Sequence, residues 1–165
     1  MLVIGVDPAL THTALAALED GKATWRGTIY IEGVEIGPRY AILRSGLEKF
    51  VRRVKARPDF VGIEEPELSV RDGHEVEHVL KLYGAFAVTF AELTRLWPHA
   101  EIRGILANRW KGTVAKKTTA GMMRAKYKIE CKNSHEWDAL GIADYSWDLA
   151  LAVQNGLTRS NTSRV

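Results

Sequence analysis

The sequence is poor in cysteine and has no long apolar run. Its single cysteine, Cys131, cannot form an internal disulfide and has no second cysteine for a thiolate metal site. No apolar stretch approaches the roughly 18 residues of a membrane-spanning helix. The opening MLVIGVDP lacks the basic region of a signal peptide and reaches Asp7 too early. We therefore expect a soluble protein of the cytoplasm.

Internal repeats and low-complexity segments are also absent, and a length of 165 residues suits one domain with a sizeable core. Apolar residues make up 46% and charged residues 26%, which is typical of a globular protein. We expect a single domain over residues 1–155. Residues 156–165 are polar, and we expect them to form a disordered tail.

Positive charge is concentrated in one segment, although the net charge of the chain is only +3. Residues 103–132 hold nine basic side chains against one acid, Glu130, so this basic segment carries +8 and the remainder carries −5. Clustered lysines and arginines are typical of proteins that bind a polyanion such as nucleic acid. A solvated lysine-rich face explains the charge equally well. The nine are Arg103, Arg109, Lys111, Lys116, Lys117, Arg124, Lys126, Lys128 and Lys132.

Short apolar, β-branched runs predict strands, and stretches with apolar residues three or four apart predict helices. The predicted strands are MLVIGV up to Asp7, then 12–18, 23–32, 60–64 and 100–105. The predicted helices run from Pro38 to Arg57, over 74–97 and over 135–153, with short helices in the basic segment. A meander followed by alternating helices and strands predicts an α/β fold, a mixed sheet with helices on its faces.

Two acidic residues lie where predicted strands end. Asp7 follows the first strand, and Glu64 ends the fourth. The carboxyl ends of parallel strands are where α/β proteins place functional groups. Alternation sends Glu64 and Glu65 to opposite faces, so only one of them can face Asp7. Taken alone, Asp7 before Pro8 is more typical of a turn.

The last predicted helix adds a histidine and a third acid, His135 and Asp138, which are three residues apart and hence on one face. Alone, each is explained by its place near the amino end of a helix. Together, several carboxylates at one sheet edge repel one another unless a cation lies between them. Oxygen-rich sites suit Mg²⁺ or Mn²⁺, and two such ions ~4 Å apart can hydrolyse a phosphodiester.

Four segments together resemble the RuvC-type Holliday junction resolvases of the RNase H-like superfamily. The family's opening strand, which ends Asp-Pro-Gly, is similar to VIGVDPALTHTALAAL. The strand that ends at the catalytic Glu resembles VGIEEPELS and places that residue at Glu64. The long helix after it is similar to HVLKLYGAFAVTFAEL. The final His/Asp-x-x-Asp-Ala-Leu motif resembles HEWDALGIA and falls on His135 and Asp138. The resemblance covers about residues 2–151.

This resemblance implies an RNase H-like fold with a five-stranded sheet over 1–155 and a role in DNA recombination and repair. It implies a homodimer that binds a four-way DNA junction and nicks two opposing strands, in the cytoplasm of a bacterial or phage-infected cell. It also implies four catalytic metal ligands: Asp7, Glu64, His135 and Asp138. Our hypothesis is that Asp7 bridges two Mg²⁺ or Mn²⁺ ions, that Glu64 and Asp138 each bind one, and that His135 completes one shell or assists water activation.

DNA contacts follow from the same resemblance. Lys111 and Lys117 fall on the family's phosphate-contacting lysines, Lys116 is an alternative to Lys117, and Arg109 lies beside them. Family members carry an aromatic residue after the catalytic Glu that disturbs the junction centre. This chain has Pro66, Glu67 and Leu68 there, so either Leu68 acts as an apolar wedge or the role is lost. His135 replaces the Asp of many relatives, and its softer imidazole favours Mn²⁺.

Two alternatives stay open. A related RNase H-like nuclease acting on RNA or on other branched DNA would use the same carboxylates. A non-catalytic nucleic-acid-binding module would keep these acids for structure alone. Cleavage of a four-way junction separates both from the resolvase.

Overall fold

The computed structural model describes residues 1–31, 35–55, 57–67, 76–112 and 116–156. The side chains of Lys116 and Lys117 lie outside the described part, as do Leu68 and the predicted tail from residue 157 onward. Within the described residues, no helix is long and apolar enough to cross a membrane.

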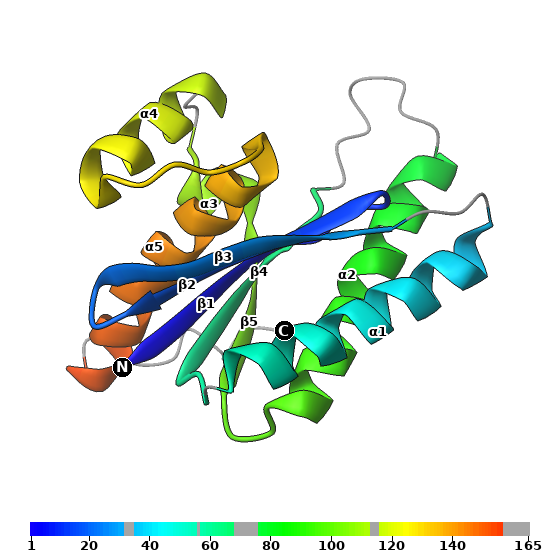
Figure 1. Ribbon diagram of the computed structural model, residues 1–165, viewed down its shortest axis with the longest axis horizontal. Coiled ribbons are helices and arrows are strands. Elements are labelled where there is room, and N and C mark those ends of the chain that lie inside the picture. The colour runs from blue at the N-terminus through cyan, green and yellow to red at the C-terminus, as the bar shows by residue number, and fades with distance from the viewer. Residues whose placement is uncertain (32–34, 56, 68–75, 113–115, 157–165) are drawn as a thin grey trace.

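Five strands form one mixed sheet in the order β3-β2-β1-β4-β5. The first three are antiparallel neighbours, whereas β4 and β5 run parallel to β1 (Figure 1). The strands are β1 Leu2–Asp7, β2 His12–Glu19, β3 Lys22–Tyr30, β4 Phe60–Glu65 and β5 Glu101–Leu106. The helices are α1 Ile36–Val54, α2 Val76–Leu96, α3 Ala107–Trp110, α4 Lys116–Tyr127 and α5 Ser134–Gln154.

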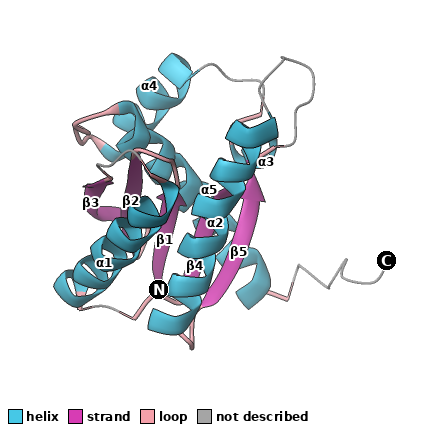
Figure 2. Ribbon diagram, turned by 90° about the vertical axis from the view of Figure 1, so that its right-hand side faces the viewer, coloured by secondary structure: helices cyan, strands magenta, loops and turns pink. Residues whose placement is uncertain are grey.

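Helices cover both faces of the sheet (Figures 1 and 2). On one face, Leu15 and Ala17 of β2 join a core with Leu43, Leu47 and Phe50 of α1 and Leu93 of α2. On the other face, Ala14, Ala16 and Leu18 pack with α5 and α4. Successive residues of β2 therefore point to opposite faces, and both faces are covered by helices. The predicted α/β fold with a five-stranded mixed sheet is therefore confirmed.

The close approach of α5 to the sheet depends on glycine. A Cβ on Gly5 of β1 would overlap the backbone of Ala139 and Ala143 in α5. A Cβ on Gly62 of β4 would overlap the side chain of Ser146, also in α5. Helix α5 therefore lies directly on β1 and β4, with its buried face formed by residues such as Leu140 and Ile142.

The first helix was predicted wrongly at both ends, and its last residue is Val54, three residues before the predicted Arg57. Helix α1 begins at Ile36, two residues before the predicted start at Pro38. Proline is tolerated there because the first backbone N–H groups of a helix have no carbonyl partner within it. The last helix, predicted over 135–153, spans Ser134–Gln154, and the side chain of Asn133 caps it by accepting a hydrogen bond from the Glu136 N–H at 2.9 Å.

We predict that Gly5→Ala lowers the free energy of unfolding by about 1–3 kcal/mol, because the added methyl group forces α5 away from β1. Urea unfolding followed by circular dichroism measures the change. Gly121→Ala is the matched control: it lies inside α4 with no neighbouring atom within 4 Å of the added Cβ. It should leave stability unchanged or raise it by up to about 1 kcal/mol. Equal stability of Gly5→Ala and the wild type would contradict the close approach.

Candidate active site

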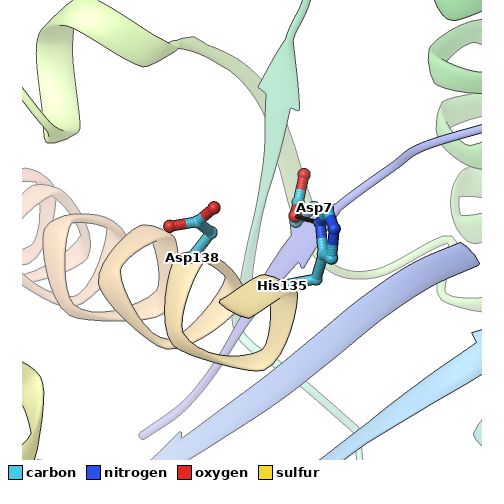
Figure 3. Close-up of side chains that lie close together, drawn as sticks. All are labelled: Asp7, His135 and Asp138. Carbon is cyan, nitrogen blue, oxygen red and sulfur yellow. Dashed lines mark hydrogen bonds and ion pairs between the residues drawn. The ribbon is translucent and has the colours of Figure 1, made fainter. Parts of the chain in front are cut away.

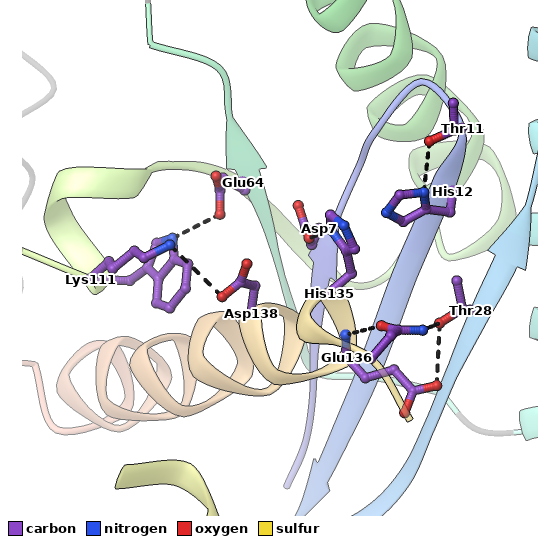
Figure 4. A network of polar contacts seen from close by, with 11 residues as sticks. Asp7, Thr11, His12, Thr28, Glu64, Lys111, His135, Glu136 and Asp138 are labelled. Atoms are coloured by element: carbon purple, nitrogen blue, oxygen red, sulfur yellow. Dashed lines mark hydrogen bonds and ion pairs between the residues drawn. The ribbon is translucent and has the colours of Figure 1, made fainter. Parts of the chain in front are cut away.

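The alternation of side chains along β1 and β4 points two acids at α5. Val61 and Ile63 of β4 belong to the core on the α1 side, so Gly62 and Glu64 face α5. Gly5 and Asp7 of β1 face the same way, and the two strands are parallel neighbours up to the pair Val6 and Ile63. Asp7 and Glu64 therefore emerge side by side at the carboxyl end of the sheet (Figure 4).

Glu65 lies on the opposite face of the sheet. Its carboxylate approaches Gly104 of β5 beside the ring of Phe86 in α2. The expectation that only one of the two adjacent glutamates can face Asp7 is confirmed, and Glu64 is that residue.

Helix α5 brings His135 and Asp138 to this corner. The Nδ1 atom of His135 lies 2.7 Å from Oδ2 of Asp7, which joins the start of α5 to the end of β1 (Figure 3). Asp7 is only 8% exposed and Asp138 only 4%. Two carboxylates this deeply buried need compensation by hydrogen bonds or by a cation.

Asp7, His135 and Asp138 form a group that could hold a metal ion. One ligand atom from each residue lies within 4.8 Å of the others. Carboxylate oxygens with one imidazole nitrogen form a donor set that suits Mg²⁺ or Mn²⁺. Glu64 lies outside this group by distance but faces it across the corner (Figure 4).

The electrostatics of Glu64 show how closely it interacts with the group. Burial raises the pKa of its carboxyl to about 7, and the neighbouring carboxylates of Asp7 and Asp138 add to the rise. The ammonium group of Lys111 and a hydrogen bond from Trp110 act in the opposite direction. Among the described side chains, the site thus sets three carboxylates against one lysine.

The end of helix α3 and the residue that follows it supply the two contacts that lower the pKa of Glu64. The indole N–H of Trp110 donates to Oε2 of Glu64 at 3.1 Å, and Nζ of Lys111 lies 3.8 Å from Oδ1 of Asp138. The Trp110 ring lies on Gly141 of α5, where a Cβ would overlap it. Lys111, predicted as a phosphate contact, therefore lies at the acidic cluster itself.

Two residues at the site were not predicted. The ring of His12 lies edge-on to that of His135, with centroids 3.7 Å apart, and its Nδ1 lies 2.7 Å from Oγ1 of Thr11. The predicted meander places the start of β2 beside the end of β1, which was the available signal for His12. Trp110 was considered only for base stacking or the core, because nothing in its local pattern indicates a carboxylate partner.

The basic segment is less open than its charge suggests. Of the seven cations whose side chains the structure describes, four contact acids. The pairs are Arg103 with Glu101, Lys111 with Asp138, Arg124 with Glu130 and Lys126 with Asp144. Arg109 of α3 is exposed near the site. The side chains of Lys116 and Lys117, and all of Leu68, lie outside the described residues.

The raised pKa of Glu64 predicts a pH-dependent stability without metal. The folded state keeps a proton that the unfolded chain releases above about pH 4.5, so stability falls between about pH 4.5 and 7. Glu64→Gln removes this loss. The measured quantity is the free energy of unfolding of Glu64→Gln minus that of the wild type, with a chelator present. We expect this difference to be roughly 1–3 kcal/mol larger at pH 8 than at pH 4.5.

Urea unfolding at a series of pH values measures this difference. Glu65→Gln is the matched control, because its side chain points away from the acidic cluster, and it should follow the wild-type profile. Parallel profiles for Glu64→Gln and the wild type would contradict the repulsion described above.

Comparison with known proteins bears on the fold. No family model matches the sequence, and a sequence search of curated proteins finds no match. Among solved structures, T. thermophilus RuvC in complex with a Holliday junction substrate is similar with a TM-score of 0.75 and 20% identity, over 94% of this chain and 96% of that chain.

A second structure of Thermus thermophilus RuvC matches with a TM-score of 0.68 and 19% identity, over 94% of this chain and 97% of that one. The yeast mitochondrial Holliday junction resolvase Ydc2 matches with a TM-score of 0.60 and 15% identity, over 94% and 82%. The chain therefore has the RuvC-type, RNase H-like fold that the resemblance of its motifs implied.

Proposed function

We propose that this protein is a structure-selective endodeoxyribonuclease that resolves four-way DNA junctions by divalent-metal-dependent hydrolysis. The observation that carries the proposal is the group of Asp7, His135 and Asp138, with Glu64 facing it, at the carboxyl end of a RuvC-type sheet. One of the similar structures is a RuvC in complex with a Holliday junction substrate, which supports the choice of substrate.

The residues at this corner fit a divalent cation. Three carboxylates meet there, and Lys111 is the one cation within 4 Å of any of them among the described lysines and arginines. We propose that Asp7, Glu64 and Asp138 would hold two Mg²⁺ or Mn²⁺ ions, and that His135 would complete one shell or assist water activation. The bound ions would polarise the phosphodiester and lower the pKa of the attacking water.

The histidine pair has its own part in this proposal. When Nδ1 of His135 donates its hydrogen to Asp7, Nε2 is left as an acceptor that can bind the attacking water or take its proton. The ring of His12, packed edge-on against His135, holds the imidazole in this orientation. The carboxylate of Asp7 thereby orients His135 as well as acting as a ligand.

Binding of the junction needs cations outside the acidic corner. We propose that Lys111, Arg109 and either Lys116 or Lys117 contact phosphates, and that Leu68 contacts the junction centre. Paired cleavage of two opposing strands requires two active sites, so we propose a homodimer.

We predict that Asp7→Asn, Glu64→Gln and Asp138→Asn each reduce cleavage of an immobile four-way junction at least about 100-fold with Mg²⁺ or Mn²⁺ present. The assay compares the junction with linear duplex and with an RNA–DNA hybrid. We expect symmetric paired nicks in the junction alone, none with a chelator, and wild-type cleavage by Glu65→Gln. Full cleavage by all three variants would show that the metal mechanism is wrong. Cleavage of the RNA–DNA hybrid alone would show that the substrate is RNA and not a DNA junction.

We also predict that Lys111→Ala and Lys117→Ala weaken junction binding and lower the slope of its salt dependence by about 1 each, because each removes one phosphate contact. Binding is measured by fluorescence anisotropy in chelator at several salt concentrations. Lys126→Ala is the control, because Lys126 is hydrogen-bonded to Asp144 at 2.6 Å, whereas Nζ of Lys111 lies 3.8 Å from Asp138, beyond hydrogen-bond distance. An unchanged slope would remove the lysine concerned from the DNA interface.

A further inference from the structure

A groove of about 570 Å³ runs along the outer edge of the sheet, between strand β3 and helix α1. Its lining includes none of the four residues of the acidic corner, Asp7, Glu64, His135 and Asp138. We call it the edge groove, and the polar or exposed side chains that define it are Arg26, Thr28, Tyr30, Lys49, Arg53 and Lys132.

The edge groove is strongly positive, and its cations flank β3 on both sides. Lys49 and Arg53 lie one turn apart on α1. Arg26 comes from β3 itself and lies on the α5 side, close enough to Cys131 for its charge to lower the pKa of that thiol. Lys132, the next residue after Cys131, lines the groove on the same side. Strand β3 thus has two cations on each side, and phosphates along it would meet positive charge from both.

One acid lines the groove, Glu136, and its carboxylate is already bound within the wall. It is 2% exposed, accepts a hydrogen bond from Oγ1 of Thr28 at 3.2 Å and accepts another from the Lys132 backbone N–H at 2.8 Å. Four cations against one buried carboxylate give the lining a net charge of +3.

These four cations are not neutralised by acidic side chains in the part of the chain that the structure describes. Among the described residues, Arg26, Lys49, Arg53 and Lys132 form no ion pair. In contrast, Lys81 pairs with Glu77, Arg103 with Glu101 and Arg124 with Glu130. The edge groove therefore gathers four unpaired cations around one hollow, where a polyanion could contact them together.

The groove begins where the acidic corner ends. Glu136 directly follows His135 in α5, and its contact with Thr28 is visible beside His135 in Figure 4. Tyr30, at the end of β3, is the strand partner of His12, whose ring packs on His135. A nucleic-acid backbone bound at the acids can continue into the groove, where Tyr30, 65% exposed, offers a ring for stacking.

The charge also argues against a protein strand as the occupant. Strand β3 is an edge strand of the sheet. The backbone N–H and C=O groups on its outer side could therefore pair with a strand of another protein. Charged side chains at an edge are a common means of preventing such pairing. Four cations on the two sides of β3 disfavour a strand but favour a polyanion.

We propose that the edge groove binds the phosphodiester backbone of the DNA substrate next to the cleavage site, through Arg26, Lys49, Arg53 and Lys132. This inference rests on the proposed function, because it takes DNA as the polyanion. It adds a second phosphate-binding surface, on the opposite side of the acidic corner from α3.

The experiment uses two double variants, one for each side of β3: Lys49→Ala with Arg53→Ala, and Arg26→Ala with Lys132→Ala. Junction binding is measured in chelator over a range of salt concentrations. We expect each pair to weaken binding about 10-fold near 0.1 M salt and to lower the salt slope by about 2.

The control is the double variant Lys81→Ala with Arg103→Ala, which removes the same charge from cations that are already paired. It should keep the wild-type slope. If both groove variants also keep it, or if only one side of β3 contributes, the inference is wrong while the proposed function stands. If the wild type neither binds nor cuts the junction, the proposed function and this inference both fall.

Discussion

The contact between helix α5 and strands β1 and β4 determines where every acidic side chain of the site can lie. Gly5 and Gly62 leave no room for a side chain between sheet and helix, so α5 lies on the strand backbones. That position puts His135 against Asp7 and turns Asp138 toward Glu64. The same helix buries Leu140 and Ile142 against the sheet. The core and the site are therefore built from the same packing surface.

The cost of this arrangement appears in its electrostatics. Bringing Asp7, Glu64 and Asp138 together in a partly buried corner raises the pKa of Glu64 toward neutrality, and Lys111 offsets only part of the repulsion. Trp110 adds a hydrogen bond to Glu64 and is held by its contact with Gly141. Repulsion between the three carboxylates does not stabilise the fold, whereas a site for a divalent cation requires several carboxylates close together.

Much of this could be predicted from the sequence, because the signals are local. The apolar runs predicted the order of strands and helices. Strand alternation showed that only one of Glu64 and Glu65 can face Asp7, and the family resemblance chose Glu64. Helical spacing placed His135 and Asp138 on one face. The start of α1 was misplaced by two residues, because proline is tolerated throughout the first turn.

The residues that could not be predicted are those whose role depends on long-range contacts. Trp110 meets Glu64 across 46 residues of sequence, and Thr28 meets Glu136 across 108. The charge count of the basic segment was misleading for a similar reason, because partners such as Asp144, 18 residues from Lys126, lie outside it. The edge groove combines cations from three distant segments, so no window along the sequence shows it.

The pair of Asp7 and His135 joins the end of the first strand to the start of the last helix, 128 residues apart in the sequence. During synthesis, the sheet strands leave the ribosome long before α5 exists. A growing chain therefore carries Asp7 and Glu64 but lacks the other two side chains of the corner. The order of the elements thus delays completion of the site until the last helix has been made and packed onto the sheet.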